Sequence, residues 1–146
     1  MMDLQTFITN HAAAHRAMEF ANSGQLSLGE IISKCEALVP DSADSPEVIF
    51  GFEYIYPTNL DSWRGIYSEL ALGFSCEETP PTLDHFIETL KNAVGATFTG
   101  YKGGEYVMSE NTPVWVANYG NSGNTAIVDV VGDAHQVILI TRHMEE

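Results

Sequence analysis

The sequence predicts an α+β fold in which three helices pack on a mostly antiparallel sheet of five or six strands. The three amphipathic stretches with helical spacing and two strand candidates precede Gly95, and short β-rich segments separated by turn residues follow it. The connections between those later strands are too short for crossovers, which favours antiparallel pairing. A length of 146 residues without linkers or repeats indicates a single domain over residues 1–146.

Three segments carry helix signals. The first runs from Met2 to Asn22, where Leu4, Phe7, Ile8, His11, His15 and Met18 recur at three- and four-residue spacing. The second runs from about Leu28 to Leu38, and Ser27 with Glu30 has the form of a capping box at its start. The third begins after Thr82 as N-cap. Its apolar stripe consists of Leu83, Phe86, Ile87, Leu90 and Val94.

The strand signals are β-branched and aromatic runs bounded by turn formers. Val48 to Tyr56 is expected to be a strand that Pro57 stops, and a turn-rich segment then extends to Gly65. Ile66 to Phe74 is a second strand candidate that would also tolerate a helix. The remaining expected strands are the two halves of Thr97–Met108 around a Gly-rich turn, Val114–Tyr119, Thr125–Val131 and Gln136–Thr141.

The charge balance excludes several function classes. Six basic residues face 20 acidic ones, for a net charge of −14. A chain so poor in cations does not suit nonspecific nucleic-acid binding or anionic membranes. No apolar run is long enough to span a bilayer, and the first residues lack signal-peptide features. Cys35 and Cys76 define no disulfide framework, so the sequence predicts a cytoplasmic protein.

The richest candidate binding segment runs from Thr99 to Thr125. Aromatic faces stack on flat ligands, amides read polar edges, and glycines let backbone N–H groups approach an anion. The same residue types also serve tight hairpins and ordinary strands, and the Lys102 region is no Walker A sequence. The candidate ligand-binding residues here are Tyr101, Lys102, Gly103, Gly104, Tyr106, Trp115, Asn118, Tyr119, Asn121 and Thr125.

A second candidate is the turn that contains Trp63 and Arg64. An arginine beside an indole offers bidentate anion recognition together with an aromatic wall. The alternative is that Arg64 makes an ordinary surface ion pair, since carboxylates are plentiful in this chain. If both candidate segments converge, they would form one ligand site.

Metal and catalytic sites find little support. His11 and His15 lie one helical turn apart, but no further ligands can be named, so we expect a partly buried helix face or a subunit contact. We therefore expect no metal and no cofactor. No nucleophile motif flanks either cysteine, and His85 or His135 could at most act as a base. The long stripe of the first helix predicts a homo-oligomer, such as a dimer.

Several stretches resemble a family of small proteins encoded by tailed bacteriophages. They are Leu26-Ser-Leu-Gly-Glu30, Leu60-Asp-Ser-Trp-Arg-Gly65, Leu70-Ala-Leu-Gly73, Thr97-Phe-Thr-Gly-Tyr-Lys-Gly-Gly-Glu-Tyr106 and Pro113-Val-Trp-Val-Ala-Asn-Tyr-Gly-Asn-Ser-Gly-Asn-Thr125. The resemblance implies an accessory protein in the bacterial cytoplasm. Small phage proteins of this kind include anti-defence sponges that trap nucleotide immune signals.

The leading hypothesis is therefore a non-enzymatic binder of a small nucleotide-like anion. One alternative is an acidic inhibitor that binds a host protein directly, which the charge of −14 favours. Another is an enzyme that cleaves a nucleotide with the same aromatic pocket. Turnover distinguishes the non-enzymatic binder from the nucleotide-cleaving enzyme, because a binder releases its ligand intact when it is denatured.

Overall fold

The structure is a computed structural model that describes residues 24–40, 45–51, 55–77, 79–100, 102–117, 124–133 and 135–143. Within these ranges the chain forms two helices and eight strands. The helices are α2 (Leu28–Ala37) and α3 (Leu83–Ala93). The strands are β1 (Glu47–Phe50), β2 (Tyr56–Ser62), β3 (Leu70–Ser75), β4 (Thr97–Thr99), β5 (Glu105–Val107), β6 (Val114–Val116), β7 (Thr125–Gly132) and β8 (Gln136–His143).

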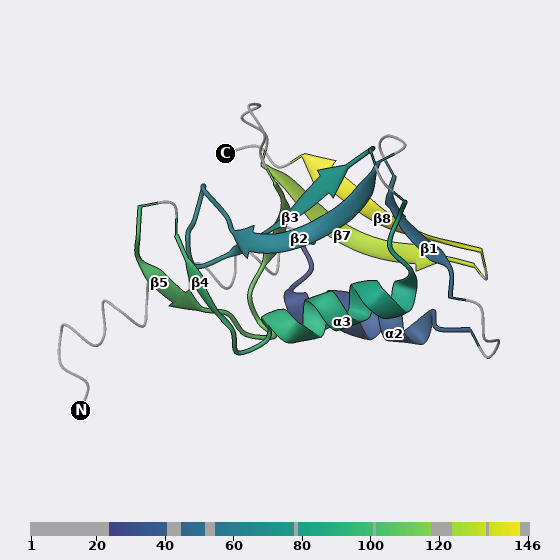
Figure 1. Cartoon of the computed structure of the whole chain (residues 1–146), viewed down its shortest axis with the longest axis horizontal. Coiled ribbons are helices and arrows are strands. Elements are labelled where there is room, and N and C mark those ends of the chain that lie inside the picture. The colour runs from purple at the N-terminus through teal and green to yellow at the C-terminus, as the bar shows by residue number, and fades with distance from the viewer. Residues whose placement is uncertain are drawn as a thin grey trace.

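Six strands form one mixed sheet in the order β1-β8-β7-β6-β3-β2. The pairs β1–β8 and β3–β6 are parallel, and the other pairs are antiparallel. The sheet curls so strongly that its two outermost strands approach each other, and the Phe50 N–H donates to the Ile55 carbonyl at 2.9 Å. The result is a nearly closed, barrel-like sheet (Figure 1). Strands β4 and β5 form a separate hairpin.

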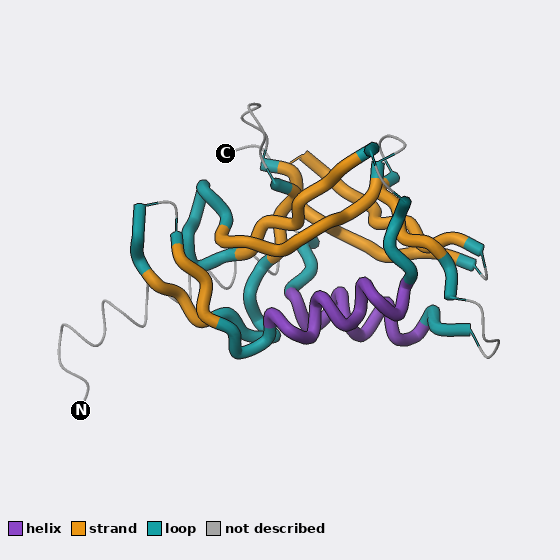
Figure 2. Tube along the Cα trace, viewed as in Figure 1, coloured by secondary structure: helices purple, strands orange, loops and turns teal. Residues whose placement is uncertain are grey.

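Both helices cover one face of the sheet, where they lie side by side (Figure 2). Helix α3 packs against β1 and β2, and α2 packs against β7. The main hydrophobic core fills the space between helices and sheet, and its largest fully buried side chains include Phe50 and Phe86. Alternation along the strands sends Leu70 and Leu72 into this core, as it does Val114 and Val116.

The two helices begin where the sequence predicts. Ser27 Oγ accepts from the Glu30 N–H at 3.3 Å, and Glu30 Oε1 accepts from the Ser27 N–H at 3.1 Å, so the capping box is confirmed. Thr82 Oγ1 accepts from the His85 N–H at 3.3 Å and caps α3.

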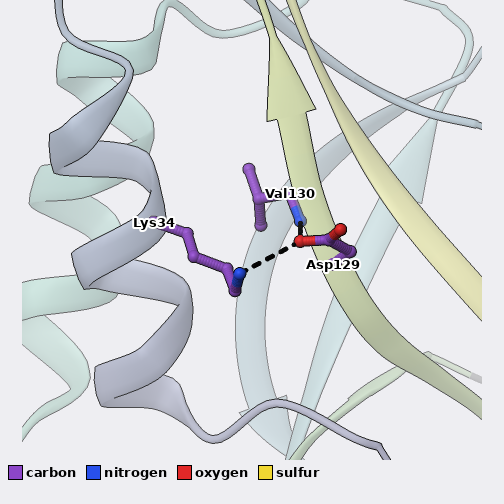
Figure 3. A network of polar contacts seen from close by, with 3 residues as sticks. All are labelled: Lys34, Asp129 and Val130. Carbon is purple, nitrogen blue, oxygen red and sulfur yellow. Dashed lines mark hydrogen bonds and ion pairs between the residues drawn. The ribbon is translucent and has the colours of Figure 1, made fainter.

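An ion pair ties α2 to the sheet. Lys34 Nζ lies 3.2 Å from Asp129 Oδ1 on β7, and the same carboxylate oxygen accepts from the Val130 N–H at 2.8 Å (Figure 3). The Val130 N–H, followed by Lys34, lowers the pKa of Asp129 below its usual range. Both side chains are nearly half exposed, so this pair contributes little to stability.

Residues 25 and 26 lie between two strands of the sheet. Within the described ranges, β6 and β7 pair through Trp115 and Ala126. Where they diverge, the Leu26 N–H donates to the Ile127 carbonyl at 2.8 Å and Gln25 Nε2 donates to the Val114 carbonyl at 3.0 Å. This segment therefore satisfies backbone groups that the sheet leaves open.

The predicted arrangement of three helices on a mostly antiparallel five- or six-stranded sheet is wrong. The described residues hold two helices and eight strands, and these strands form a nearly closed, barrel-like sheet and a separate hairpin. Antiparallel pairs are the majority, but β3 pairs with β6 and β1 pairs with β8 in parallel, because parallel partners need not be consecutive in the chain. The helix expected over Met2–Asn22 lies outside the described residues.

Three local boundaries also differ from the prediction. Pro57 does not stop a strand but lies inside β2, next to a register shift between Pro57 and Leu60, which is a position where a strand tolerates proline. Residues 64–69 form turns, so the strand expected from Ile66 begins only at Leu70. Val94, expected in the apolar stripe of α3, is its C-cap and is 36% exposed.

Candidate functional site

Two tryptophans 52 positions apart in the sequence stack on each other in the structure. The ring centroids of Trp63 and Trp115 are 4.1 Å apart, and the ring planes differ by 10°. The side chains are 5% and 7% exposed. Trp115 Nε1–H donates to Glu69 Oε1 at 2.8 Å, and Glu69 is itself buried. A buried indole N–H requires such an acceptor, and this carboxylate supplies it.

The tryptophan pair forms a second apolar cluster on the sheet face opposite the main core. Trp115 alternates with core residues on β6, so its side chain points to the other face. Ala71 on β3 and Ala126 on β7 are its buried neighbours there, and their small side chains leave room for two indoles. The two tryptophan rings therefore pack against each other and are buried.

Gly65 lies against the ring of Trp63. A Cβ at position 65 would come within 2.5 Å of Trp63 Cη2 and 2.7 Å of Cζ2 and Cζ3. These atoms belong to a ring that the stack with Trp115 holds in place, so it cannot move aside easily. The glycine after Arg64 thus serves close packing on the indole.

We expect Gly65→Ala to lower the free energy of unfolding by about 1–3 kcal/mol, because it overpacks a fixed aromatic ring. The measurement is urea denaturation of the variant and of the parent chain. The matched control is the same substitution in a Trp63→Phe background, where the clashing six-membered ring of the indole is absent. The cost of Gly65→Ala should shrink there, and an equal cost in both backgrounds would contradict the contact.

The Gly-rich turn of the predicted binding segment is the tip of the β4–β5 hairpin. The Gly100 N–H donates to the Gly104 carbonyl at 2.6 Å, and the Gly103 N–H donates to the Gly100 carbonyl at 2.9 Å. Gly103 has a φ of 97°, a conformation that favours glycine. A Cβ at Gly104 would lie 3.0 Å from the Tyr106 hydroxyl oxygen. These glycines therefore have structural roles in the turn.

A contact between tyrosines brings the two predicted binding segments together. The ring centroids of Tyr67 and Tyr106 are 6.3 Å apart, with the planes tilted by 48°. A Cβ at Gly100 would lie 3.0 Å from the Tyr106 ring and 3.1 Å from Tyr67 Cβ, so both tyrosines cover this glycine. Tyr67 belongs to the turn that follows Arg64, and Ser62 Oγ anchors that turn by donating to the Tyr67 carbonyl at 2.6 Å. The turn and the hairpin are thus neighbours.

Arg64 and Lys102 are both exposed, one on each of these neighbouring segments. Among the described residues, the other lysines are paired: Lys34 with Asp129 at 3.2 Å and Lys91 with Glu36 at 3.1 Å. Lys102 has no carboxylate within ion-pair distance in the described part of the chain. An ammonium group without a carboxylate partner is accessible to an anion.

Negative charge is distributed unevenly along the chain. Residues 89–128 contain two acidic residues, Glu105 and Glu110, and two basic residues, Lys91 and Lys102. They therefore contribute no net charge, and the whole −14 comes from the rest of the sequence. The hairpin and the tryptophan strand β6 both fall within this neutral stretch. This stretch therefore adds no net repulsion of an anion.

Of the remaining candidates, Thr125 lies on β7 and the others lie outside the described residues. Thr125 begins β7, opposite His143 of β8, and precedes the alanine that pairs with Trp115. Tyr101, Asn118, Tyr119 and Asn121 lie outside the described residues, as do His11 and His15.

The groove along α2 does not include the candidate residues. It has a volume of about 740 Å³, and its walls also include the end of α3 and the loop after β5. Its lysines, Lys34 and Lys91, are engaged by Asp129 and Glu36. Its lining residues are Ser27, Gly29, Glu30, Ile32, Ser33, Lys34, Glu36, Lys91, Val94, Glu110 and Asn111.

The described residues contain no group of three or more His, Cys, Asp or Glu side chains that could hold a metal ion. Burial raises the pKa of the Cys35 thiol to about 12, so Cys35 is a thiol at neutral pH and not a nucleophile. None of the described helices is long and apolar enough to cross a membrane.

Comparison of the chain with protein-family models, curated proteins and solved structures finds no match.

Sequence reasoning missed two residues that organise this region. Glu69 precedes an apolar run and gives no periodic signal of its own, yet it accepts from the Trp115 indole. The available signal was that a buried tryptophan needs an acceptor. The second residue is Tyr67, whose contact with Tyr106 joins positions far apart in the chain, and no local sequence pattern reports such a contact.

Proposed function

We propose that this protein binds a small, anionic, nucleotide-like ligand on the surface shared by the Arg64–Tyr67 turn and the tip of the β4–β5 hairpin, and that it does so without chemical conversion. The observation that carries the proposal is the contact between Tyr67 and Tyr106, with ring centroids 6.3 Å apart. It makes neighbours of the two segments that carry the exposed side chains of Arg64 and Lys102.

Each group has a defined part in this binding. The Arg64 guanidinium can contact two oxygens of a phosphate at once, and the Lys102 ammonium adds a second cation. The half-buried rings of Tyr67 and Tyr106 offer aromatic surface to a base. Trp63 and Trp115 act as positioning residues, since their stack holds the base of the Arg64 turn.

The biological setting that we propose is sequestration of a host signalling nucleotide in the bacterial cytoplasm, and it rests on the resemblance to phage proteins. Direct inhibition of a host protein and cleavage of a nucleotide are the competing functions.

The test begins with a nucleotide-rich bacterial extract. The immobilised protein is mixed with the extract, washed and denatured by heat, and mass spectrometry identifies the compounds released. An intact phosphorylated compound, released in proportion to the protein, supports the proposal. A converted product would instead indicate an enzyme, and the absence of any retained compound would favour direct binding of a host protein.

Single substitutions then test the surface. Lys102→Ala and Arg64→Ala should each weaken binding of the released compound by about 1.5–3 kcal/mol, or roughly ten- to a hundredfold, as measured by calorimetry. The matched control is Lys34→Ala, which removes the same charge from α2 and should leave affinity nearly unchanged. Because the protein repels anions at long range, added salt should change affinity little. Full affinity in both site variants, or a steep loss with salt, would contradict the site.

A further inference from the structure

Among the described residues, the outer edge of β5 in the β4–β5 hairpin has no partner strand. Within the described ranges β5 pairs with β4 alone, and β4 lies on the side of the hairpin that faces β2 (Figure 1). Val107 on β5 is 71% exposed, the highest value among the exposed large hydrophobic side chains of the described residues. Natural proteins usually protect an open strand edge, by pairing it or by placing charges along it.

The hydrogen-bond pattern of the hairpin shows which backbone groups point outward. The Met108 N–H donates to the Ala96 carbonyl at 2.9 Å, and the Gly100 N–H donates to the Gly104 carbonyl at 2.6 Å. In an antiparallel ladder such pairs alternate with pairs whose backbone groups point away from the partner strand. Glu105 and Val107 belong to these alternate pairs, so their N–H and C=O groups face out from β5.

We propose that β5 pairs with β5 of a second copy of this chain, antiparallel and about a two-fold axis at Tyr106. In this register Glu105 lies opposite Val107 of the second copy, and each such pair exchanges both of its backbone hydrogen bonds. The two hairpins become one four-stranded sheet. No carboxylate faces another across the axis, whereas a parallel pairing in register would place Glu105 beside its own copy.

The charge distribution favours the hairpin as the meeting point of two copies. Each copy carries −14, so the copies repel each other wherever their acidic surfaces approach. Residues 89–128, which include the hairpin, carry no net charge. Contact through β5 therefore places a stretch without net charge at the axis. The inference does not depend on the proposed ligand, because pairing uses backbone groups of β5.

The test is the mass of the full chain in solution, measured by sedimentation equilibrium at about 100 µM, a concentration that populates a complex with a micromolar dissociation constant. We expect a dimer of the 16.0 kDa chain. Val107→Glu should convert it to monomer, because the introduced carboxylate would face Glu105 of the second copy, while the exposed position leaves the fold intact by circular dichroism. Val107→Thr, which keeps a β-branched neutral side chain, is the matched control and should remain dimeric.

The register of the β5–β5 pairing is tested by reversing the charge at position 105 in the Val107→Glu variant. Adding Glu105→Lys to Val107→Glu places a lysine opposite each introduced glutamate and should restore the dimer, since only pairing about Tyr106 brings these positions together. A monomeric parent chain, a Val107→Glu variant that stays dimeric, or a double variant that stays monomeric would each overturn the proposal.

Discussion

Replacement of Trp115 by alanine is expected to lower the free energy of unfolding by about 3–5 kcal/mol, the range for removing a large buried aromatic side chain. Trp115 is 7% exposed and stacks on Trp63 with 4.1 Å between ring centroids. Its Nε1–H also donates to the buried Glu69 carboxylate at 2.8 Å. The substitution therefore opens a cavity and removes a donor from a buried acceptor. Urea denaturation followed by circular dichroism measures the loss.

Two further variants separate the stack from the hydrogen bond. Trp115→Phe keeps an aromatic ring but has no indole N–H, so its cost should be smaller than that of alanine and should reflect mainly the bond to Glu69. A double-mutant cycle of Trp115→Ala with Trp63→Ala should give a coupling of about 0.5–1.5 kcal/mol, the usual value for an aromatic pair. A loss below about 1 kcal/mol for Trp115→Ala would be typical of an exposed residue and would contradict the buried stack.

The helices could be predicted because their signals are local. Ser27 and Glu30 stand three positions apart, as a capping box requires, and both of its hydrogen bonds form. Thr82 precedes an apolar stripe at helical spacing, and Leu83, Phe86 and Leu90 are buried in α3 as that stripe implies. Each of these features needs only residues within about three turns of each other.

The sheet could not be predicted in full because its pairings are long-range. Most strand segments were located, and the strand–turn–strand pattern of β4 and β5 is confirmed. The partner of each strand could not be predicted. For example, β1 pairs with β8, with Val48 opposite Val137, but neither segment carries a sequence signal that identifies its partner. The rule that short connections imply antiparallel pairs applies only to strands that follow each other in the chain.

In the candidate site, too, the residue types could be predicted from the sequence but their packing could not. Aromatic residues near Arg64 and near Lys102 were selected for their chemistry, but their packing decides what each can do. Trp63 and Trp115 stack on each other, whereas Tyr67 and Tyr106 lie where the Arg64 turn and the β4–β5 hairpin meet. The glycines expected to approach an anion instead provide a positive φ at Gly103 and close packing against Tyr106 at Gly104. Residue type alone does not distinguish these roles.

Phe86→Ala on α3 is expected to cost about 3–5 kcal/mol of unfolding free energy, because Phe86 is 1% exposed and is among the largest fully buried side chains. Its helix lies over β1 and β2, the two ends of the curled sheet. The segment before α3 is also bonded to β1: the Val48 N–H donates to the Pro81 carbonyl at 2.9 Å, and the Leu83 N–H donates to the Pro46 carbonyl at 2.7 Å. A cavity beneath α3 therefore weakens the closure of the sheet as well as the core.

Glu88→Ala provides the matched control for that substitution. Glu88 is exposed on the same helix, and alanine suits a helix interior at least as well, so the free energy of unfolding should change by less than about 0.5 kcal/mol. Amide hydrogen exchange adds a second measurement. If α3 holds the ends of the sheet together, Phe86→Ala should reduce protection at Val48 and Leu83, the donors that join it to β1. A small loss of stability, or a loss of the same size in Glu88→Ala, would show that α3 is not packed on the sheet.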